Sequence, residues 1–295
     1  MPGFTSFAIA GAGNIGKVIA EELLKKKDAG EISSVAILTR TAGSHEDLGA
    51  RGAKIIPVDY SSPSSLNAAF SNIDVVVSCL PETCDEKGLA EAAKAAGVKL
   101  IVPSDYASGP VEQTEDHPLY RSRARMRQTC KEFELPYAVF WTGMFSDMML
   151  GPEYSGFLGF NFTEDEIMIP GSGTEPISWT SSTDIARFIG HVLVNLPREK
   201  LEWRIFRVEG DRIGLNDIAV SWQKYSNKAV SISHRSRSEI EDEVRKNPND
   251  IGPAFLLELD AGHLIVGSPD ELTNYEFPQW KPKKVIDILV EIYDQ

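Results

Sequence analysis

The sequence is poor in cysteine. Its 295 residues include only Cys79, Cys84 and Cys130, with no Cys-x-x-Cys pair. An odd number of cysteines at these spacings predicts neither a disulfide framework nor a zinc site. The five histidines are scattered without the spacing of metal ligands, so we expect no bound metal. Free thiols are typical of a reducing compartment, and we expect a cytoplasmic protein.

Long apolar runs and an excess of positive charge are also missing. No stretch approaches the ~20 apolar residues of a membrane-spanning helix. The opening MPGFTSFAIAGAG has no basic region ahead of its apolar run, unlike a signal peptide. The formal net charge of −13 makes general nucleic-acid binding unexpected, because an acidic surface repels polyanions. The basic run at 121–127 is interpreted first as a solvated helix face, with anion binding as the alternative.

Short apolar runs alternate with helical patterns from residue 4 to about 140. The runs are nearly continuous, which is typical of parallel strands covered on both faces. This alternation predicts an α/β, Rossmann-type, doubly wound parallel sheet. The predicted strands are 4–10, 34–39, 53–58, 74–80, 98–103 and 136–141, and the predicted helices are 14–27, 63–71, 85–96 and 117–133.

The pattern loosens after residue 145, where glycine turns and the aromatic stretch GFLGFNF occur. We expect residues 1–150 to form the Rossmann-type domain and residues 151–295 a smaller mixed α/β region. No clean linker separates them, so this lobe is expected to be integral. Its predicted helices are 181–196, 214–226, 236–247 and 282–292, and its predicted strand is 201–210.

The strongest local signal is AGAGNIGK, residues 10–17, which follows the first predicted strand and opens a helix. In a dinucleotide fingerprint, Gly11 permits the tight turn, Gly13 admits the diphosphate, and Gly16 lets helix and strand pack closely. The diphosphate lies at the helix N-terminus, where free N–H groups favour negative charge. The alternative is an ordinary strand-to-helix turn. The predicted cofactor contacts here are Gly11, Ala12, Gly13, Asn14, Ile15 and Gly16.

The end of the second predicted strand indicates which cofactor is bound. NAD-binding folds usually place Asp or Glu there to bind the ribose 2′-hydroxyl. Here Thr39 and Arg40 stand at that position. A guanidinium binds a 2′-phosphate through paired, charge-assisted hydrogen bonds, so the sequence predicts NADP(H). Ser44 and His45 are weaker additions to this phosphate site, and a solvent-facing arginine is the alternative.

Later strand ends point to the same crevice, because ligands collect at the carboxyl ends of parallel strands. A turn or cap role is the alternative for each of these residues taken singly. The further predicted cofactor contacts are Asp59, Tyr60, Ser78, Cys79, Leu80 and Ser104.

Several segments, taken in order, resemble one family. The chain resembles the NmrA-like, isoflavone-reductase-like branch of the atypical short-chain dehydrogenases, which includes phenylcoumaran benzylic ether and pinoresinol reductases. The match runs from about residue 4 to 290, although the family's frequent GxxGxxG is GxGxxG here, with Ala10 at the first glycine. Besides the glycine fingerprint, the matching features are Arg40, VVVSCLPE (75–82), VPSDYA (102–107), LPY (135–137), Phe145 and TNYE (273–276).

The resemblance implies catalytic positions. Its reductases carry a lysine, acting as general acid/base or substrate-orienting cation, where this chain has Arg123. Because an arginine keeps its proton, we expect Arg123 to orient a substrate oxygen or stabilise an oxyanion. Tyr120, one helical turn earlier, is the predicted proton donor, with a packed aromatic as the alternative. Tyr106 and His117 are other candidates for proton transfer.

The resemblance also places Gly143, Met144 and Phe145 at the nicotinamide end of the cofactor. Soft and aromatic side chains in this segment suit a flat aromatic substrate, although core packing is the alternative.

The sequence therefore predicts an NADPH-dependent oxidoreductase that reduces a small aromatic, quinone or enone-type molecule. The alternative is a non-catalytic NADP(H)-binding redox sensor acting through a protein partner, which the replacement of the family lysine by Arg123 favours. An isomerase is weaker, since the Tyr-x-x-x-Lys pair it needs is missing after both Tyr106 and Tyr120.

Overall fold

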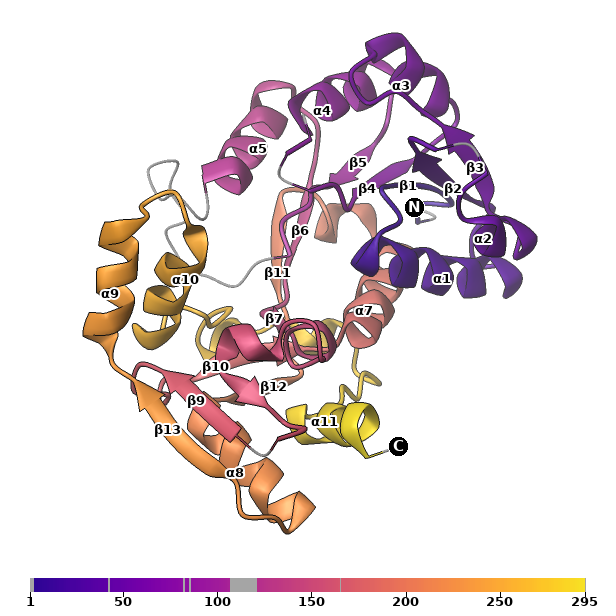
Figure 1. The fold of residues 1–295 in the computed structure, drawn as a ribbon. Coiled ribbons are helices and arrows are strands. Elements are labelled where there is room, and N and C mark those ends of the chain that lie inside the picture. Colours follow the sequence, from indigo (N-terminus) through magenta and orange to yellow (C-terminus); the bar gives the residue numbers. More distant parts are fainter. Residues whose placement is uncertain are drawn as a thin grey trace.

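A five-stranded parallel sheet forms the centre of the first half of the chain (Figure 1). The computed structural model describes residues 3–41, 43–81, 83–84, 86–106, 121–164 and 166–294. The strands follow the order β3-β2-β1-β4-β5, so the chain reverses its direction across the sheet between β1 and β4, where ligand crevices open in such folds. The strands are β1 (Ser6–Ala10), β2 (Ser34–Thr39), β3 (Lys54–Pro57), β4 (Val75–Ser78) and β5 (Leu100–Val102).

Apolar side chains on both faces explain why this sheet is central. All five residues of β1 are buried, and its four apolar residues alternate between two hydrophobic cores. Phe7 and Ile9 belong to the core on one face, and Ala8 and Ala10 to the core on the other, as the two-residue period of a strand requires.

Helices cover both faces of the sheet, which confirms the predicted α/β, doubly wound architecture (Figure 1). One face is covered by α1 (Asn14–Asp28) and α7 (Ser182–Asn195). The other face is covered by α3 (Pro63–Ala69), α4 (Glu86–Ala95) and α5 (Arg121–Glu132). The short α2 (Glu46–Ala50) was not predicted. Of the helix predicted at 117–133, residues 117–120 lie outside the described residues.

The second half of the chain contributes to this first body. Strand β6 (Ala138–Trp141) joins the edge of β5 through a parallel bridge between Ile101 and Tyr137, and β11 (Arg204–Arg207) pairs with it in parallel. Helix α7 packs along α1 (Figure 1). Helix α7 and strand β11 follow residue 150 in the chain but pack with the first body. The predicted boundary between a cofactor domain and a substrate region at residue 150 therefore stays a prediction about function.

The remaining elements form a lobe with its own apolar core, in the lower part of Figure 1. The chain enters it at β7, directly after β6, and two small sheets support it, in the orders β12-β10-β7 and β13-β9-β8. Helix α10 and strands β9, β10, β12 and β13 were not predicted. The elements are β7 (Met144–Phe145), α6 (Ser146–Met149), β8 (Phe160–Asn161), β9 (Glu166–Pro170), β10 (Ile177–Thr180), β12 (Asp211–Ile213), α8 (Leu215–Ser226), β13 (Ser231–Arg235), α9 (Arg237–Lys246), α10 (Ile251–Asp260) and α11 (Val285–Tyr293), with short 3-10 turns at Ser155–Leu158, Arg198–Lys200, Pro269–Glu271 and Asn274–Glu276.

The aromatic stretch GFLGFNF packs inside this lobe. Phe160 and Phe162 are buried and stacked, with ring centroids 5.0 Å apart. Phe157 is partly exposed and contacts Phe255 of α10. At least the second half of this stretch therefore packs in the core of the lobe rather than facing a ligand.

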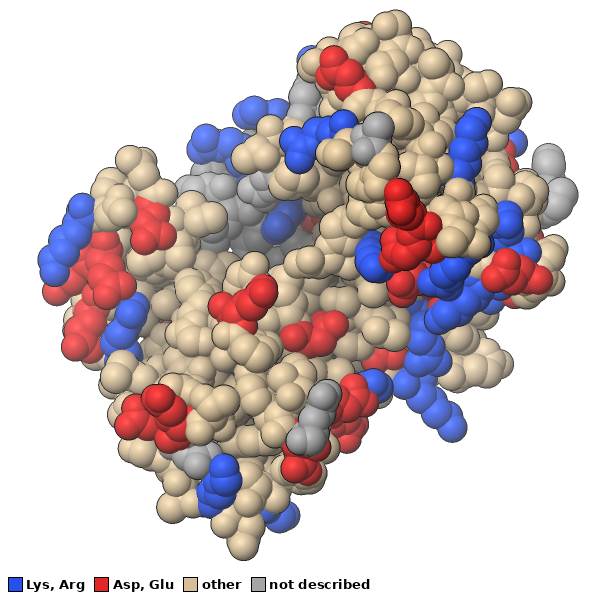
Figure 2. Space-filling view, turned by 45° about the vertical axis from the view of Figure 1, so that its right-hand side comes forward, with Lys and Arg blue, Asp and Glu red and all other residues tan. Residues whose placement is uncertain are grey.

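Charged side chains of both signs are interspersed over the face shown in Figure 2. Near the N-terminus of α1, for example, Lys17 pairs with Asp47 at 2.7 Å. Within the described ranges, no helix is both long and apolar enough to span a bilayer.

A buried carboxylate holds the start of α7 and supplies a stability prediction. Asp184 is 2% exposed; its Oδ2 accepts hydrogen bonds from Ser181 Oγ (2.8 Å) and the Lys283 backbone N–H (3.0 Å), and Oδ1 pairs with Arg187 (3.0 Å). Asp184→Ala would leave these donors without their acceptor, so we expect a loss of about 3 kcal/mol in the free energy of unfolding. Urea denaturation followed by circular dichroism measures it.

Asp217 provides a matched control, because it occupies the same third helical position in α8 but is exposed. Asp217→Ala should cost less than about 1 kcal/mol. Equal losses in the two variants would contradict the role assigned to the buried carboxylate.

Candidate functional site

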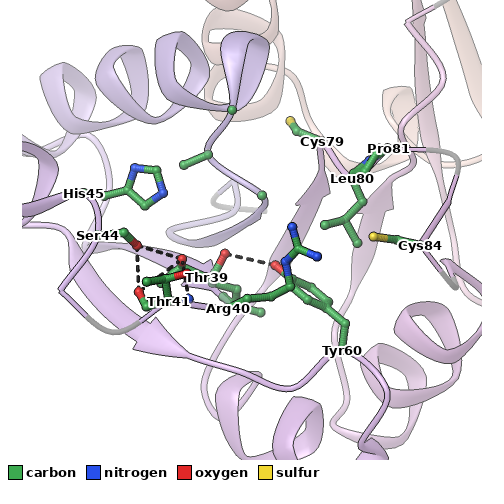
Figure 3. Close-up of a pocket in the computed structure, with 14 residues that line it drawn as sticks. Thr39, Arg40, Thr41, Ser44, His45, Tyr60, Cys79, Leu80, Pro81 and Cys84 are labelled. Atoms are coloured by element: carbon green, nitrogen blue, oxygen red, sulfur yellow. Dashed lines mark hydrogen bonds between the residues drawn. The ribbon is translucent and has the colours of Figure 1, made fainter.

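A pocket of about 330 Å³ opens at the carboxyl ends of β1 to β4, on the side where the strand order reverses (Figure 3). The turn after β1 forms one wall, the end of β2 and the following loop form another, and residues after β3 and β4 close it. Its lining residues are Gly11, Ala12, Gly13, Leu38, Thr39, Arg40, Thr41, Ser44, His45, Tyr60, Cys79, Leu80, Pro81 and Cys84.

The three glycines of the fingerprint have three different surroundings. Gly11 has φ +88°, in the left-handed region that favours glycine, and a Cβ there would lie 3.1 Å from the Cys79 carbonyl oxygen. A Cβ on Gly16 would lie 2.0 Å from the Gly11 carbonyl oxygen, so this position needs glycine for α1 to approach the turn. A Cβ on Gly13 would meet no atom of the described residues within 4 Å. Folding therefore explains Gly11 and Gly16 but leaves Gly13 unexplained.

The N-terminus of α1 is available to an anion. Gly13 is its N-cap and has no side chain with which to cap it, and no acidic residue lies in the first turn. The first amide N–H groups of a 15-residue helix and its dipole then face the open side of Gly13. Together with the space beside Gly13, this arrangement fits a diphosphate group.

Positive charge and hydroxyl groups lie at the end of β2. Arg40 is exposed and its side chain reaches into the pocket (Figure 3). Thr39 Oγ1 and Ser44 Oγ are 2.8 Å apart, and the Ser44 hydroxyl also donates to the Thr41 carbonyl at 2.8 Å. No carboxylate lines this pocket among the described residues. The donor set fits a phosphate group on a ribose.

Less polar residues form the other side of the pocket. The Tyr60 hydroxyl donates to the Leu38 carbonyl at 2.9 Å, and burial raises the pKa of Tyr60 above its ordinary range. Leu80 and Cys84 complete this wall. Burial also raises the pKa of the Cys79 thiol to about 12, so the thiol stays protonated and is no nucleophile at neutral pH.

A second, smaller pocket of about 180 Å³ adjoins the first, since Leu80 and Cys84 line both. It lies between the start of α4, the end of β5 and the start of α5. Arg123 lines it, together with Ser104 and the carboxyl of Glu86. The structure thus brings Arg123 and Glu86, a carboxyl that sequence reasoning did not single out, into the same pocket.

The predicted cofactor residues divide into two groups. Gly11, Ala12, Gly13, Thr39, Arg40, Tyr60, Cys79 and Leu80 line the larger pocket, as do Ser44 and His45. The other predicted residues do not line it. They are Asn14, Ile15, Gly16, Asp59, Ser78, Ser104, Gly143, Met144 and Phe145.

Specific contacts explain why several of the predicted cofactor residues do not line the larger pocket. Asp59 Oδ1 accepts hydrogen bonds from the backbone and hydroxyl of Ser61, so it stabilises its own turn. The Ser78 side chain is buried and donates to Glu86. Gly143, with φ +70°, allows close approach to Ser178, where a Cβ would lie 2.2 Å from the carbonyl oxygen. Met144 then begins β7, buried in the core of the lobe.

The structure describes one of the three residues that were candidates for proton transfer. Tyr120 and His117 lie outside the described residues. Tyr106 is 8% exposed, and its hydroxyl donates to the Ser78 carbonyl at 3.0 Å. Burial raises the pKa of Tyr106 well above its ordinary value, which makes it a poor source of protons.

Sequence reasoning missed part of both pockets. Leu38, Thr41 and Cys84 line the larger pocket without having been predicted. Leu38 and Thr41 flank the predicted Thr39 and Arg40, so a wider window at that strand end would have included them. Cys84 carried no such signal, because only the path of the loop after β4 brings it there.

Comparison with known proteins shows relatives in sequence and in fold. The chain is 27% identical over 272 residues to the oxidoreductase swnR of Metarhizium robertsii, covering 85% of each protein. It is 24% identical over 281 residues to the phenylcoumaran benzylic ether reductase PT1 of Pinus taeda, covering 91% of this chain and 88% of that protein. The fold resembles leucoanthocyanidin reductase from Vitis vinifera in its binary complex with NADPH, with a TM-score of 0.80, 20% identity, and coverage of 98% and 99%. The model of the NmrA-like family matches residues 7–257, and this chain belongs to that family.

Proposed function

We propose that this protein binds NADP(H) in the larger pocket. The diphosphate lies at the N-terminus of α1 beside Gly13, and Arg40 pairs with the 2′-phosphate of the ribose. The observation that carries the proposal is the open space at Gly13, because no contact among the described residues requires glycine there. The NADPH complex of leucoanthocyanidin reductase, which shares the fold, supports the choice of dinucleotide.

We further propose that the protein is a reductase of a small aromatic, quinone or enone-type molecule. Bound NADPH supplies a hydride. Arg123 lines the adjoining pocket and holds the oxygen of the substrate, where its guanidinium stabilises negative charge as it develops. The names of a relative, phenylcoumaran benzylic ether reductase, and of a structural neighbour, leucoanthocyanidin reductase, support this substrate class.

A redox sensor is the second candidate function. Arg123 stands where the reductases resembled by this chain carry lysine, and a guanidinium does not release its proton at physiological pH. A protein that only binds the dinucleotide needs no proton donor. It would pass the redox state of the cofactor to a protein partner.

Turnover separates the two candidates. For the reductase, we expect NADPH oxidation, followed at 340 nm, with at least one member of a panel of quinones, enones and benzylic ethers. Arg123→Ala should slow this reaction about tenfold, because one hydrogen bond to developing charge is lost. Arg121→Ala is the control, since Arg121 lies on the same helix but outside the pocket. Tight binding of NADP+ and NADPH without turnover on the whole panel would favour the sensor.

A further inference from the structure

The carboxyl of Glu86 is the most unusual group of the second pocket. It lies at the start of α4, partly buried, and its side chain lines the pocket together with Arg123. Its Oε1 accepts a hydrogen bond from the Ser78 hydroxyl at 2.5 Å and another from the Ser104 backbone N–H at 3.1 Å. Two elements of the central sheet thus fix the position of this carboxyl at the edge of the predicted cofactor site.

The second oxygen, Oε2, has a different environment. Within the described part of the chain, no hydrogen bond to it is found, and it is not sealed in the interior. A proton on Oε2 would therefore sit on the side of the carboxyl that is not held by Ser78 and Ser104. Both hydrogen bonds to Oε1 persist whether the carboxyl is neutral or charged, so proton release requires no rearrangement of these contacts.

The surroundings of the Glu86 carboxyl favour its neutral, protonated form more than bulk water would. Burial raises the pKa of Glu86 above its ordinary value and Asp105 adds to this, while the hydrogen bonds from Ser78 and Ser104 and the charge of Arg123 act in the opposite direction. Asp105 is itself paired with Arg127. The titratable and charged groups around Glu86 are Cys79, Lys87, Asp105, Tyr106, Arg123, Arg125 and Cys130.

We propose that Glu86 is the proton donor of this site and that Arg123, beside it, holds the substrate oxygen. The proposal rests on the reductase function proposed above. It assigns to the Glu86 carboxyl the donation of a proton, which the Arg123 guanidinium cannot perform.

The reaction balances with these groups. A hydride from bound NADPH forms a bond to the carbonyl carbon of the substrate, and the C=O electron pair moves onto the oxygen beside Arg123. The Oε2–H bond of Glu86 breaks as the new O–H bond of the product forms. Glu86 is left as a carboxylate, stabilised by Ser78 and Ser104, and takes its next proton from solvent water.

Two alternatives among the described residues are weaker. The Tyr106 hydroxyl is buried and already donates to the Ser78 carbonyl. The thiol of Cys79, with a pKa raised by burial to about 12, is too weak an acid. Glu86 combines an oxygen that holds no hydrogen bond within the described part of the chain, a fixed position and a neighbouring cation.

A titration of the Glu86 carboxyl tests the proposal without any substrate. In protein labelled with 13C at glutamate Cδ, the resonance missing from Glu86→Gln identifies Glu86. We expect its titration midpoint to lie above the ~4.3 of glutamate in model peptides. The midpoint should be lower in the NADP+ complex than in the NADPH complex, because the oxidised nicotinamide ring is positively charged and a nearby carboxylate is stabilised by it.

Each outcome has a distinct meaning. A midpoint at or below the model-peptide value would overturn the proposal, as would identical midpoints in two complexes that calorimetry shows to be formed. If calorimetry detects no binding of either dinucleotide, the proposed function itself fails. These failures are therefore distinguishable.

Kinetics with 1,4-naphthoquinone as the probe supply a second readout. We expect Glu86→Gln to bind NADPH like the wild type but to reduce the quinone about 100-fold more slowly. Wild-type activity should fall as pH rises through the pKa of Glu86, since the neutral acid is lost, and this fall should be absent in the variant. Glu91→Gln, which removes an exposed carboxylate from the same helix, is the control. An unchanged rate in Glu86→Gln would contradict the proposal.

Discussion

Replacing Arg40 with alanine is expected to weaken NADPH binding about 100-fold while changing the affinity for NADH less than about threefold. The guanidinium lies at the end of β2, where the adenosine ribose of a Rossmann-bound dinucleotide lies, and its target is the 2′-phosphate. Loss of a paired, charge-assisted contact costs about 2 to 3 kcal/mol, which corresponds to this factor. NADH has no 2′-phosphate, so it loses no such contact. Isothermal titration calorimetry with both dinucleotides measures the effect.

Arg51→Ala is the control for a general loss of positive charge. Arg51 follows α2, is exposed and lies outside the pocket. It should leave both affinities within about twofold, because exposed charges are largely screened by salt. A wild-type protein that prefers NADH would show that Arg40 has been assigned the wrong role. An equal loss of both dinucleotides in Arg40→Ala would instead indicate a structural role.

The cofactor half of the site could be predicted because its signals are local. Glycines in a fixed spacing after an apolar strand specify a turn, and the next strand end follows about one βαβ unit later. Gly13 and Arg40 both line the pocket as a consequence of this short-range order. The α/β class followed from the same strand–helix alternation, which the sheet order confirms.

The position of Glu86 could not be predicted, because it depends on three separated segments. Its carboxyl is held by Ser78 at the end of β4 and Ser104 after β5, and it meets Arg123 of α5. In the sequence it is one of several acidic residues at the start of a helix, where a carboxylate is ordinarily explained by the helix dipole. Only the packing of α4 and α5 against the sheet distinguishes it.

The second lobe was harder to predict for a related reason. Its strands are short and pair over long separations: β13 with β9, and β10 with both β7 and β12. β13 is largely exposed, so its residues lack the apolar run that identified the central strands. Helix α10 begins at Ile251, and Asp250 is its N-cap. A glycine and a proline follow within three residues, and in a sequence such residues indicate a turn rather than a helix.

Gly13→Val should abolish measurable dinucleotide binding while leaving the fold intact. Gly13 has φ −75°, outside the left-handed region that favours glycine, and a Cβ there meets none of the described atoms within 4 Å. The change in the free energy of unfolding should therefore stay within about 1 kcal/mol. The isopropyl group would instead fill the space assigned to the diphosphate. We expect NADPH and NADH to bind more than 1,000-fold more weakly, a cost of about 4 kcal/mol.

Gly16→Ala is the contrasting variant. Its Cβ would lie 2.0 Å from the Gly11 carbonyl oxygen, so the turn and α1 must separate. It should lower the thermal midpoint as well as the affinity, whereas Gly13→Val should lower the affinity alone. Calorimetric titration and thermal unfolding of both variants test this difference. If Gly13→Val binds both dinucleotides like the wild type, the diphosphate does not lie at the N-terminus of α1, because a branched side chain and a phosphate group cannot occupy the same volume.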